Sequence, residues 1–448
     1  MLAFVNKYVF GSAVPIILVF AGIYYTVILR GFHLRRIGVI IASMTRKRDK
    51  REGGISPFRA LTLALAGTLG VGNIVGVSAA IYLGGFGSIF WMWVSALCAM
   101  ILKYAEIVLA MNHRRFDNEG RPHGSAMLYI KDFFNSLGSK RLAKYIPALF
   151  AVLCIINSVS MGSMIQVNAV ASSFESVFCF SPIVVGIVLS ILVLVIISSG
   201  SDGISRFTEV LVPLMSLGYV ILSMAVIFLR REMLGAVFNS IFSSAFSSAS
   251  AAGGVVGFLL SRALRYGTMR GLVSNEGGCG TAPAAHATSN AASAVEQGFF
   301  GIFEVFVDTL VLCTMTAVVV IISYPSVSHL GDNFIMMTIS AYGAVLGDFA
   351  EYFLAVAVLC FAFATVICWA HYGMESVGYL SDKKASRVIF VAIYSVSVLA
   401  GAVINSEVIW ECADFAIGAM TLINVTVICF MSGEVRISTK NYFKTKSR

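Results

Sequence analysis

The sequence predicts an all-α membrane protein that crosses the bilayer about eleven times. Hydrophobic residues make up 58% of the 448-residue chain and charged residues only 12%, whereas soluble domains hold about 25% charged residues. The mean hydropathy is +0.87. The apolar residues are gathered into runs close to the ~20 residues that a helix needs to cross a hydrocarbon core. The chain is therefore a polytopic membrane protein, with the lipid bilayer as its surroundings.

The apolar runs follow one another with short connections. We expect transmembrane helices near residues 9–29, 58–82, 87–111, 145–174, 182–199, 207–229, 246–264, 298–322, 350–376, 388–404 and 410–431. Their order divides the chain into an extra N-terminal helix with a basic segment (1–57), a first five-helix repeat (58–230), a second five-helix repeat (231–432) and a basic tail (433–448).

Lys and Arg gather in alternate connections, which predicts the orientation. They are frequent in residues 30–57, 112–144, 383–387 and 433–448, and absent from 175–181, 323–349 and 405–411. Positively charged loops stay on the cytoplasmic side. We therefore expect a protein of the cell (inner) membrane with its N-terminus outside and its C-terminus in the cytoplasm. The net charge of +9 then reflects topology, and we exclude nucleic acid as a partner.

The residues that most enzymes use are scattered. Nine cysteines and six histidines show neither the spacing of a zinc site nor a nucleophile beside a base. The sequence therefore predicts a protein that is not an enzyme and has no cofactor. Lys103 and Glu106 are three residues apart, and we expect an ion pair on the helix surface near the cytoplasmic end of their span. We expect Arg270, Asn275 and Glu276 in a cytoplasmic loop.

The most informative segment is a glycine-rich break, residues 66–76, inside the second apolar run. Backbone groups that leave a helix at membrane depth need a partner other than water, and a bound solute or ion is one. Close packing of two helices through Gly72 and Gly76 is the alternative. The glycines at positions 70 and 72 let backbone N–H groups approach a carboxylate. Asn73, an amide in an apolar span, favours the solute site.

A second small-residue region lies at residues 247–257, five spans further along the chain. Paired interruptions at corresponding places in two halves are typical of secondary transporters built from inverted repeats. We infer two repeats of five spans from this order and spacing.

Several ordered motifs resemble the alanine or glycine:cation symporter family. They are the segments 67–77, 84–94, 103–106, 162–170, 270–280, 297–298, 308–309 and 361–373. The resemblance covers most of residues 58–430. It implies a fold of the leucine-transporter (LeuT) type and sodium-coupled uptake of alanine, glycine or a related small amino acid. Family members often carry other residues at Val71, Phe86 and 277–281, which leaves serine or D-alanine open as substrates.

The resemblance also implies site residues. Sodium would be held by the carbonyl groups of Ala66 and Leu69 and by Ala362 and Thr365. The amino acid would contact Gly70, Gly72, Asn73, Gln166, Thr365 and Trp369. Simpler roles stay open: Thr365 could bond to the carbonyl four residues before it, Trp369 could serve packing alone, and Gln166 could join two helices.

These expectations describe alternating access around a site at the membrane midplane, in a protein that works as a monomer. Two alternatives remain. One is coupling to protons, with Asp308, Glu304 and Glu375 as the candidate relay. The other is a transporter-like receptor that binds an amino acid without moving it.

Overall fold

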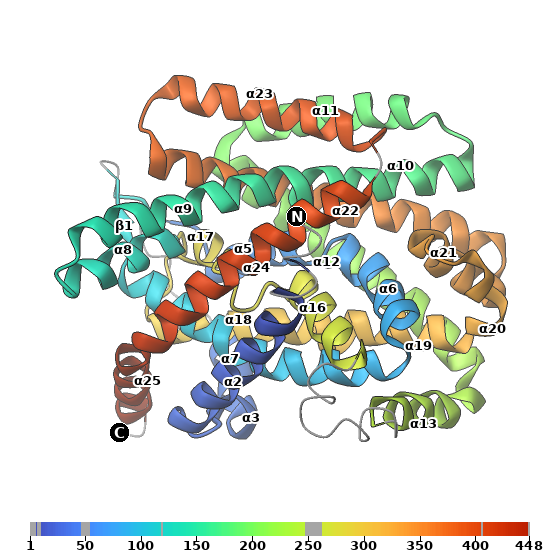
Figure 1. Cartoon of the computed structure of the whole chain (residues 1–448), viewed down its shortest axis with the longest axis horizontal. Coiled ribbons are helices and arrows are strands. Elements are labelled where there is room, and N and C mark those ends of the chain that lie inside the picture. The colour runs from blue at the N-terminus through green and yellow to red at the C-terminus, as the bar shows by residue number, and fades with distance from the viewer. Residues whose placement is uncertain are drawn as a thin grey trace.

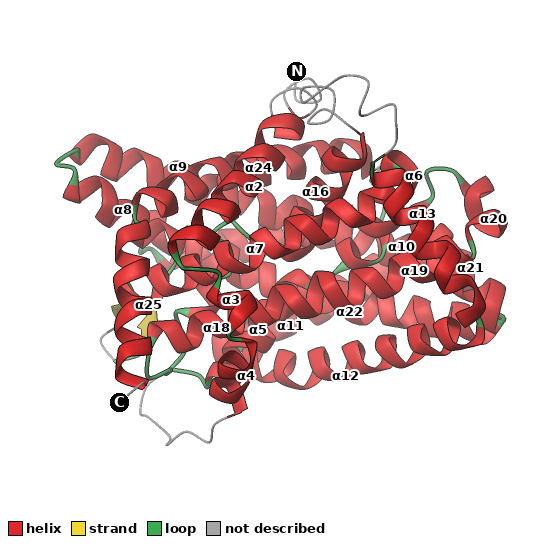
Figure 2. Ribbon diagram, turned by 90° about the horizontal axis from the view of Figure 1, so that it is seen from below, coloured by secondary structure: helices red, strands yellow, loops and turns green. Residues whose placement is uncertain are grey.

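The computed structural model is built almost entirely of helices (Figures 1 and 2). It describes residue 6 and residues 10–45, 54–117, 120–246, 262–404 and 406–446. Within these residues the structure has one sheet, an antiparallel pair of short strands, β1 (Arg115–Phe116) and β2 (Pro122–His123). The prediction of an all-α membrane protein is confirmed.

Helices form at the expected spans other than 246–264, most of which lies outside the described residues. They are α2 (Gly11–Ile28), α5 (Pro57–Thr68) with α6 (Val75–Gly84), α7 (Gly87–Asn112), α9 (Lys140–Val159) with α10 (Ile165–Phe178), α11 (Pro182–Ser198), α12 (Gly200–Leu229), α18 (Ala294–Val305) with α19 (Thr314–Ile322), α22 (Asp348–Leu380), α23 (Lys384–Gly401) and α24 (Ser406–Phe430). Among the described residues, seven helices are long and apolar enough to cross a membrane, or up to eight with the bent pair α5–α6. The count of eleven is therefore not confirmed.

Shorter helices lie between these spans and after them. They are α3 (Phe32–Arg35), α4 (Ile37–Thr45), α8 (Ala126–Ser136), α13 (Leu234–Ala245), α16 (Arg262–Asn275), α17 (Pro283–His286), α20 (Tyr324–Val327), α21 (Phe334–Leu346) and α25 (Ser432–Lys446).

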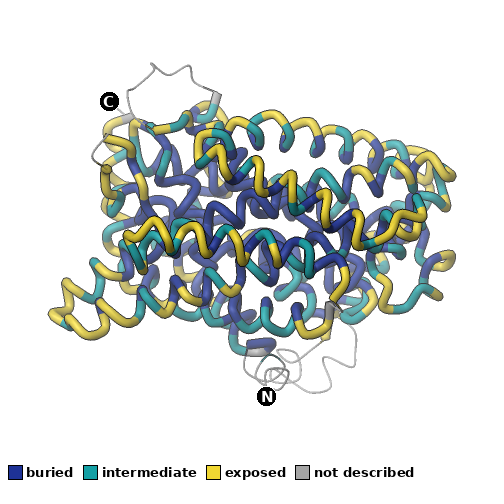
Figure 3. The backbone as a smooth tube through the Cα atoms, turned by 90° about the horizontal axis from the view of Figure 1, so that it is seen from above, coloured by how far each residue is buried: buried dark blue, intermediate teal, exposed yellow. Residues whose placement is uncertain are grey.

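The helices divide into an inner bundle and an outer layer (Figure 3). In the most apolar window of α7, 89% of the residues are buried, and the figure for α22 is 72%. The corresponding values are 28% for α23 and 33% for α12. Exposed apolar side chains cover the outer helices, for example Val396 on α23 and Val210 on α12. In lipid such a surface is expected, because an apolar face has nothing to gain from being covered.

Three of the inner spans are irregular. The pair α5–α6 bends by 62° around a 3₁₀ turn, Val71–Asn73. Between α9 and α10 the chain forms a π-helical segment, Ser160–Met164, and between α18 and α19 a longer one, Phe306–Cys313. Such π-segments are rare and frequently occur at functional sites.

Two stretches that we expected to be loops contain helices. The prediction that Arg270 lies in a cytoplasmic loop is wrong. Residues 262–275 form the buried helix α16, which packs against α6 and α7. Its arginines lowered the apolar signal, but the guanidinium of Arg270 lies 4.8 Å from the ring centroid of Trp410 and 3.8 Å from the carboxylate of Asp414. The connection 323–349 likewise includes α21. The small-residue region 247–257 lies outside the described residues.

A polar clasp ties the last helix to the end of α7. His113 follows α7 directly, and its Nδ1 lies 2.8 Å from Asp132 of α8 while its Nε2 lies 3.1 Å from Glu434 of α25. Arg115 donates to the same Asp132 carboxylate at 2.7 Å. The hydrogen bond to Glu434 raises the pKa of His113 above its ordinary value of 6.5. Burial opposes the change at Glu434, but the hydrogen bonds from His113 and Asn112 lower the pKa of this carboxyl below 4.5.

We predict that the docking of α25 weakens as the pH rises. A raised folded-state pKa gives His113 a stabilising contribution that is complete below pH 6.5 and is lost as the pH passes the folded value. The lowered pKa of Glu434 gives a contribution that is complete above pH 4.5 and lost below it. Hydrogen exchange of residues 432–446 between pH 6 and 9 should therefore reveal a loss of protection of about two- to fivefold, the range of a partly exposed ion pair.

The variant His113→Gln is the control for this measurement, because it lacks the titrating group. Amide exchange has the same intrinsic pH dependence in both proteins, so comparing them removes that effect. Its protection should not vary with pH beyond that intrinsic effect. Equal pH dependence in the wild type and the variant would contradict the prediction.

Candidate substrate and ion site

The break between α5 and α6 arises from residues that end one helix without starting the next. Helix α5 begins at Pro57, and the Ser56 hydroxyl accepts a hydrogen bond from the Arg59 N–H. After Thr68 the helical pattern stops, because the Gly70 N–H bonds to the Thr68 carbonyl instead of continuing the helix. Gly70 is extended, with φ −118° and ψ −157°. Some backbone groups of residues 69–74 still bond locally, but others, such as the Val71 N–H, are bonded to side chains of other helices.

Gln166 of α10 supplies one of these partners. Its Oε1 accepts a hydrogen bond from the Val71 N–H at 2.9 Å, and its Nε2 donates to the Met161 carbonyl at 3.1 Å. Met161 belongs to the π-helical segment between α9 and α10. One amide side chain thus joins the irregular parts of two spans, and it is almost completely buried.

Thr365 of α22 contacts the same break from the opposite repeat. A Cβ atom placed on Gly70 would lie 2.6 Å from the Thr365 Oγ1 and 2.8 Å from the Gln166 Oε1. The three residues therefore surround one point, and only glycine fits between the two side chains. The Thr365 hydroxyl also lies 2.9 Å from the Ala66 carbonyl oxygen and 3.0 Å from that of Phe361.

This hydroxyl has one hydrogen and two acceptor lone pairs. If it donates to Phe361, its lone pairs and the Ala66 carbonyl oxygen face each other without a proton between them. Hard cations prefer such neutral and carbonyl oxygens. The two other expected sodium contacts, Leu69 and Ala362, are buried at the end of α5 and one turn before Thr365 on α22.

Trp369 lies one turn beyond Thr365 and closes the site on the side of the π-segment. A Cβ atom on Gly162 would lie 2.3 Å from the Trp369 Cβ. The indole is completely buried, and its ring meets Tyr372 edge-on at 5.5 Å. Its Nε1 has no hydrogen-bond acceptor among the described residues. A buried donor without a partner carries a free-energy cost, and an incoming acceptor would remove that cost.

Gly72 and Asn73, the other two residues expected to contact the substrate, face α16 and the π-segment between α18 and α19. A Cβ atom on Gly72 would approach the Ser274 Cα of α16 at 3.4 Å. Asn73 donates to the Asp308 carboxylate at 2.7 Å, in the π-segment between α18 and α19. Ser274 and Thr309 donate to the second oxygen of that carboxylate at 2.8 and 2.7 Å. The Asn73 Oδ1 is buried, and no donor in the described part of the chain reaches it.

A chain of buried charges continues from this cluster toward α18. Lys103 donates to the Asn275 carbonyl and to Glu304, both at 2.6 Å, and the other Glu304 oxygen lies 3.1 Å from His286. The expected surface pair of Lys103 with Glu106 is wrong: both side chains are completely buried. Glu106 instead accepts hydrogen bonds from Asn424 and from the Gly280 N–H. Helix spacing indicated the neighbour on the same helix, but burial made partners on other helices necessary.

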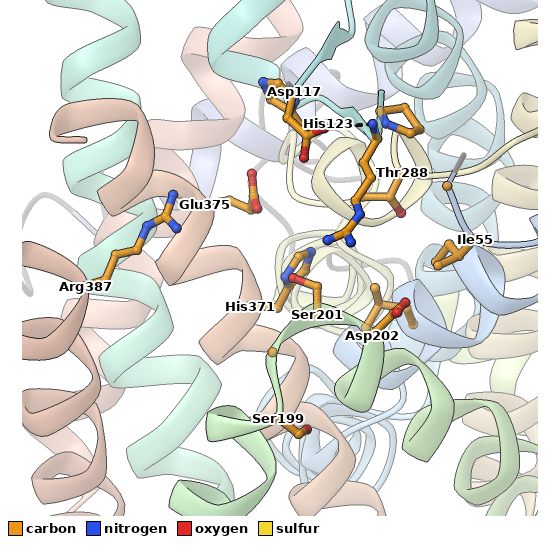
Figure 4. Close-up of a pocket in the computed structure, with 15 residues that line it drawn as sticks. Ile55, Asp117, His123, Ser199, Ser201, Asp202, Thr288, His371, Glu375 and Arg387 are labelled. Carbon is orange, nitrogen blue, oxygen red and sulfur yellow. Dashed lines mark hydrogen bonds between the residues drawn. The ribbon is translucent and has the colours of Figure 1, made fainter. Parts of the chain in front are cut away.

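A cavity of about 790 Å³, which we call the vestibule, is lined in part by residues of α5 and α22 (Figure 4). Its walls include Leu63 of α5, His371 and Glu375 of α22, Asp202 of α12, Arg387 of α23 and the loop around His123. His371 lies six residues, or about 9 Å along a helix, beyond Thr365. The Leu63 carbonyl accepts a hydrogen bond from the Cys368 thiol at 3.0 Å. The two helices that meet at the break thus also form the inner wall of the vestibule.

The structure brings most of the expected site residues together. Ala66, Gly70, Gln166 and Thr365 lie together at the break, and Trp369 lies one turn beyond Thr365 against Gly162. Gly72 and Asn73 instead face α16 and Asp308. The sequence reasoning left out Ser274, Gly162 and the Lys103 chain as parts of the surroundings. A charged residue inside an apolar span was the available signal for Lys103, and the glycine before Gln166 was a weaker signal for Gly162.

Comparisons with known proteins identify the family. A profile of the sodium:alanine symporter family matches residues 1–448. The chain belongs to this family. An uncharacterised transporter of Bacillus subtilis, YflA, is 33% identical over 446 residues, covering 99% of this chain and 93% of the relative. The sodium/alanine symporter AgcS of Methanococcus maripaludis is 32% identical over 445 residues, covering 98% of this chain and 96% of AgcS.

The fold agrees with the family. The crystal structure of MhsT in complex with L-phenylalanine matches with a TM-score of 0.58 at 12% identity, covering 85% of this chain and 89% of MhsT. The predicted LeuT-type fold is confirmed. Because the family consists of symporters, the chain is a multi-pass membrane transporter of amino acids and not an enzyme.

We predict that Gly70→Ala damages the site. The added methyl group would push Thr365 and Gln166 apart and weaken the Gln166–Val71 hydrogen bond. Overpacking of this kind costs about 1–3 kcal/mol of unfolding free energy, and the displaced groups should weaken binding of a labelled amino acid at least ~10-fold. Melting temperature in detergent and a binding assay measure the two effects.

Gly76→Ala is the matched control. Gly76 belongs to the same broken span, but a Cβ atom there would meet no atom of the described residues outside its own helix backbone within 4 Å. This variant should bind and melt like the wild type. Equal behaviour of the two alanine variants would contradict the prediction.

A second prediction concerns the buried ion pair. Lys103→Met should lower the unfolding free energy by about 3–5 kcal/mol, because Glu304 would stay buried without its cation. The double variant Lys103→Met with Glu304→Gln should recover most of this loss, since no uncompensated charge remains. Thermal unfolding of both variants in detergent tests the coupling. Equal destabilisation of the single and double variants would exclude it.

Proposed function

We propose that the protein imports small neutral amino acids, alanine and glycine above all, together with sodium. The single observation that carries this proposal is the meeting of Gly70, Gln166, Thr365 and the Ala66 carbonyl at the break of α5 and α6. Here unwound backbone, a hydroxyl and a carbonyl oxygen lie together at membrane depth. Discontinuous helices of this kind are where secondary transporters bind substrate and coupling ion.

The two sides of the break suit different charges. The first N–H groups of α6 and of the 3₁₀ turn suit the carboxylate of an amino acid, because helix N-termini attract anions. The Ala66 carbonyl and the Thr365 hydroxyl suit sodium. Both groups lie within one turn of Gly70, so each bound species favours the other through opposite charge, and such coupling is reciprocal.

The packing favours a short substrate side chain. Gly70 and Gly162 have no room for even a methyl group against Thr365, Gln166 and Trp369. We therefore propose alanine, glycine and serine as substrates, with D-alanine as an alternative to the L-isomer. A relative named as a sodium/alanine symporter supports this choice.

The vestibule supports an inward-facing conformation. Its lining residues come from segments that the distribution of Lys and Arg places in the cytoplasm, such as the loop around His123 and the start of α23 at Arg387. In this state we propose that the amino acid reaches the cytoplasm through the vestibule, past Leu63 and His371, which line it. Rocking of the bundle would close this path and open the site outward.

Uptake into liposomes tests the proposal. Purified protein should accumulate labelled alanine when sodium is higher outside, and an inward proton gradient without sodium should leave the label near equilibrium. Accumulation driven by protons alone would establish the alternative coupling. Binding without accumulation under either gradient would indicate a receptor.

Thr365 variants locate the ion within the same assay. Thr365→Val removes the hydroxyl but keeps the shape, so the sodium concentration for half-maximal uptake should rise at least ~10-fold, equivalent to about 1.4 kcal/mol. Thr365→Ser keeps the hydroxyl and should stay within about threefold of the wild type. Unchanged sodium dependence in the valine variant would remove Thr365 from the ion site.

Proton coupling has one observation in its favour. Asp308, Lys103, Glu304 and His286 form an almost continuous buried chain beside the break. Ionisable residues inside a membrane domain are commonly parts of proton relays. The sodium-free proton gradient above is the experiment that separates the two readings.

A further inference from the structure

A second cavity, separate from the vestibule, lies where the first span ends. It has a volume of about 590 Å³ and lies between the α2–α3 connection and α25. Figures 1 and 2 show α25 and α3 at the same end of the molecule. Among the described residues, six cations and no carboxylate line the cavity: Arg30, Arg35, Arg36, Arg436, Lys440 and Lys444. All six are exposed.

Four of these cations have no ion-pair partner among the residues that the structure describes. Among the described residues, no carboxylate forms an ion pair with Arg30, Arg35, Arg436 or Lys440. The Arg36 guanidinium lies over the ring of Phe443, 4.4 Å from its centroid. A cluster of like charges held together is unfavourable unless something compensates it. An anion bound in the cavity would compensate these charges.

The floor of the cavity is rigid and aromatic. The ring of Phe443 packs against Phe32 with the centroids 5.8 Å apart, and Phe32 packs against Tyr104 at 4.8 Å. The Tyr104 hydroxyl is hydrogen bonded to that of Thr439 at 2.7 Å. Contacts with α7 thus fix both walls, so the cations on them are held at the mouth of a preformed hollow.

The surroundings of the cavity are those of a membrane interface. Val27, just before the lining residue Ile28, is 69% exposed, and Ile437, just after Arg436, is 61% exposed. Ile28 and Leu29 also line the hollow. Apolar surface that faces lipid is therefore next to the basic cavity. A lipid with acyl chains and an anionic headgroup needs these two kinds of surface side by side.

We propose that this cavity binds the headgroup of an anionic phospholipid, with the acyl chains along Val27 and Ile437. The shared chemistry is a phosphate group, which arginine pairs bind in a forked geometry. Basic pockets between helices at the cytoplasmic face are known to take acidic lipid headgroups. The continuity with the lipid-facing surface favours a lipid over a soluble phosphate. The site is distinct from the transport site and does not depend on the substrate.

Native mass spectrometry of the full-length protein in detergent tests the proposal with two probes, phosphatidylglycerol and zwitterionic phosphatidylcholine. The wild type should retain phosphatidylglycerol in preference to phosphatidylcholine. The triple variant Arg36→Gln, Arg436→Gln, Lys440→Gln should bind phosphatidylglycerol about 100-fold more weakly, given the contribution of each basic residue near a membrane surface. The double variant Arg436→Gln, Lys440→Gln changes only exposed residues of α25 and should lose about tenfold with its melting temperature unchanged.

The control removes three cations from another place. Lys140, Arg141 and Lys144 are exposed on α9, and changing all three to glutamine should leave lipid retention unaltered. An equal loss in this control, or no loss in the triple variant, would overturn the proposal. Displacement of phosphatidylglycerol by millimolar inorganic phosphate in the wild type would assign the cavity to a soluble anion and also overturn it.

Discussion

The whole arrangement depends on backbone groups that leave a helix inside the membrane. Between Thr68 and Val75 the chain makes few helical hydrogen bonds, and no water is available in hydrocarbon to replace them. The Gln166 amide and the Thr316 hydroxyl, which donates to the Asn73 carbonyl at 2.9 Å, take their place. Each comes from a different span, so the break holds several spans in register around itself.

This constraint explains why three inner spans are irregular together. The π-segment at 160–164 presents the Met161 carbonyl to Gln166, and the π-segment at 306–313 presents Asp308 to Asn73. A regular helix would keep the Met161 carbonyl for its own hydrogen bonding. Each irregular segment therefore supplies a partner for another one. The outer helices α11, α12 and α23 contain none of these segments and form the surface that faces the lipid.

The sequence predicted the features that depend on residues close to one another in the chain. Apolar length predicted the spans, because crossing a bilayer requires it, and the glycines of 66–76 predicted the break. Together with family resemblance, the sequence also indicated Gln166 and Thr365, which the structure places against Gly70. It failed where distant residues compensate one another: Arg270 looked like a loop residue because Trp410 and Asp414 are more than a hundred positions away, and Lys103 was paired with Glu106 because Glu304 is equally remote. Periodicity carries no information about such partners.

Helix α22 carries Thr365 at the break and Glu375 at the vestibule on one stretch of 33 residues, and within it the structure has no break. Because the helix has no internal break, a displacement of Thr365 that tilts the helix as a rigid body would also displace Glu375, unless the pivot lies at Glu375 itself. An occupant at the break would then alter the lining of the vestibule without any residue between the two places having to change its local conformation.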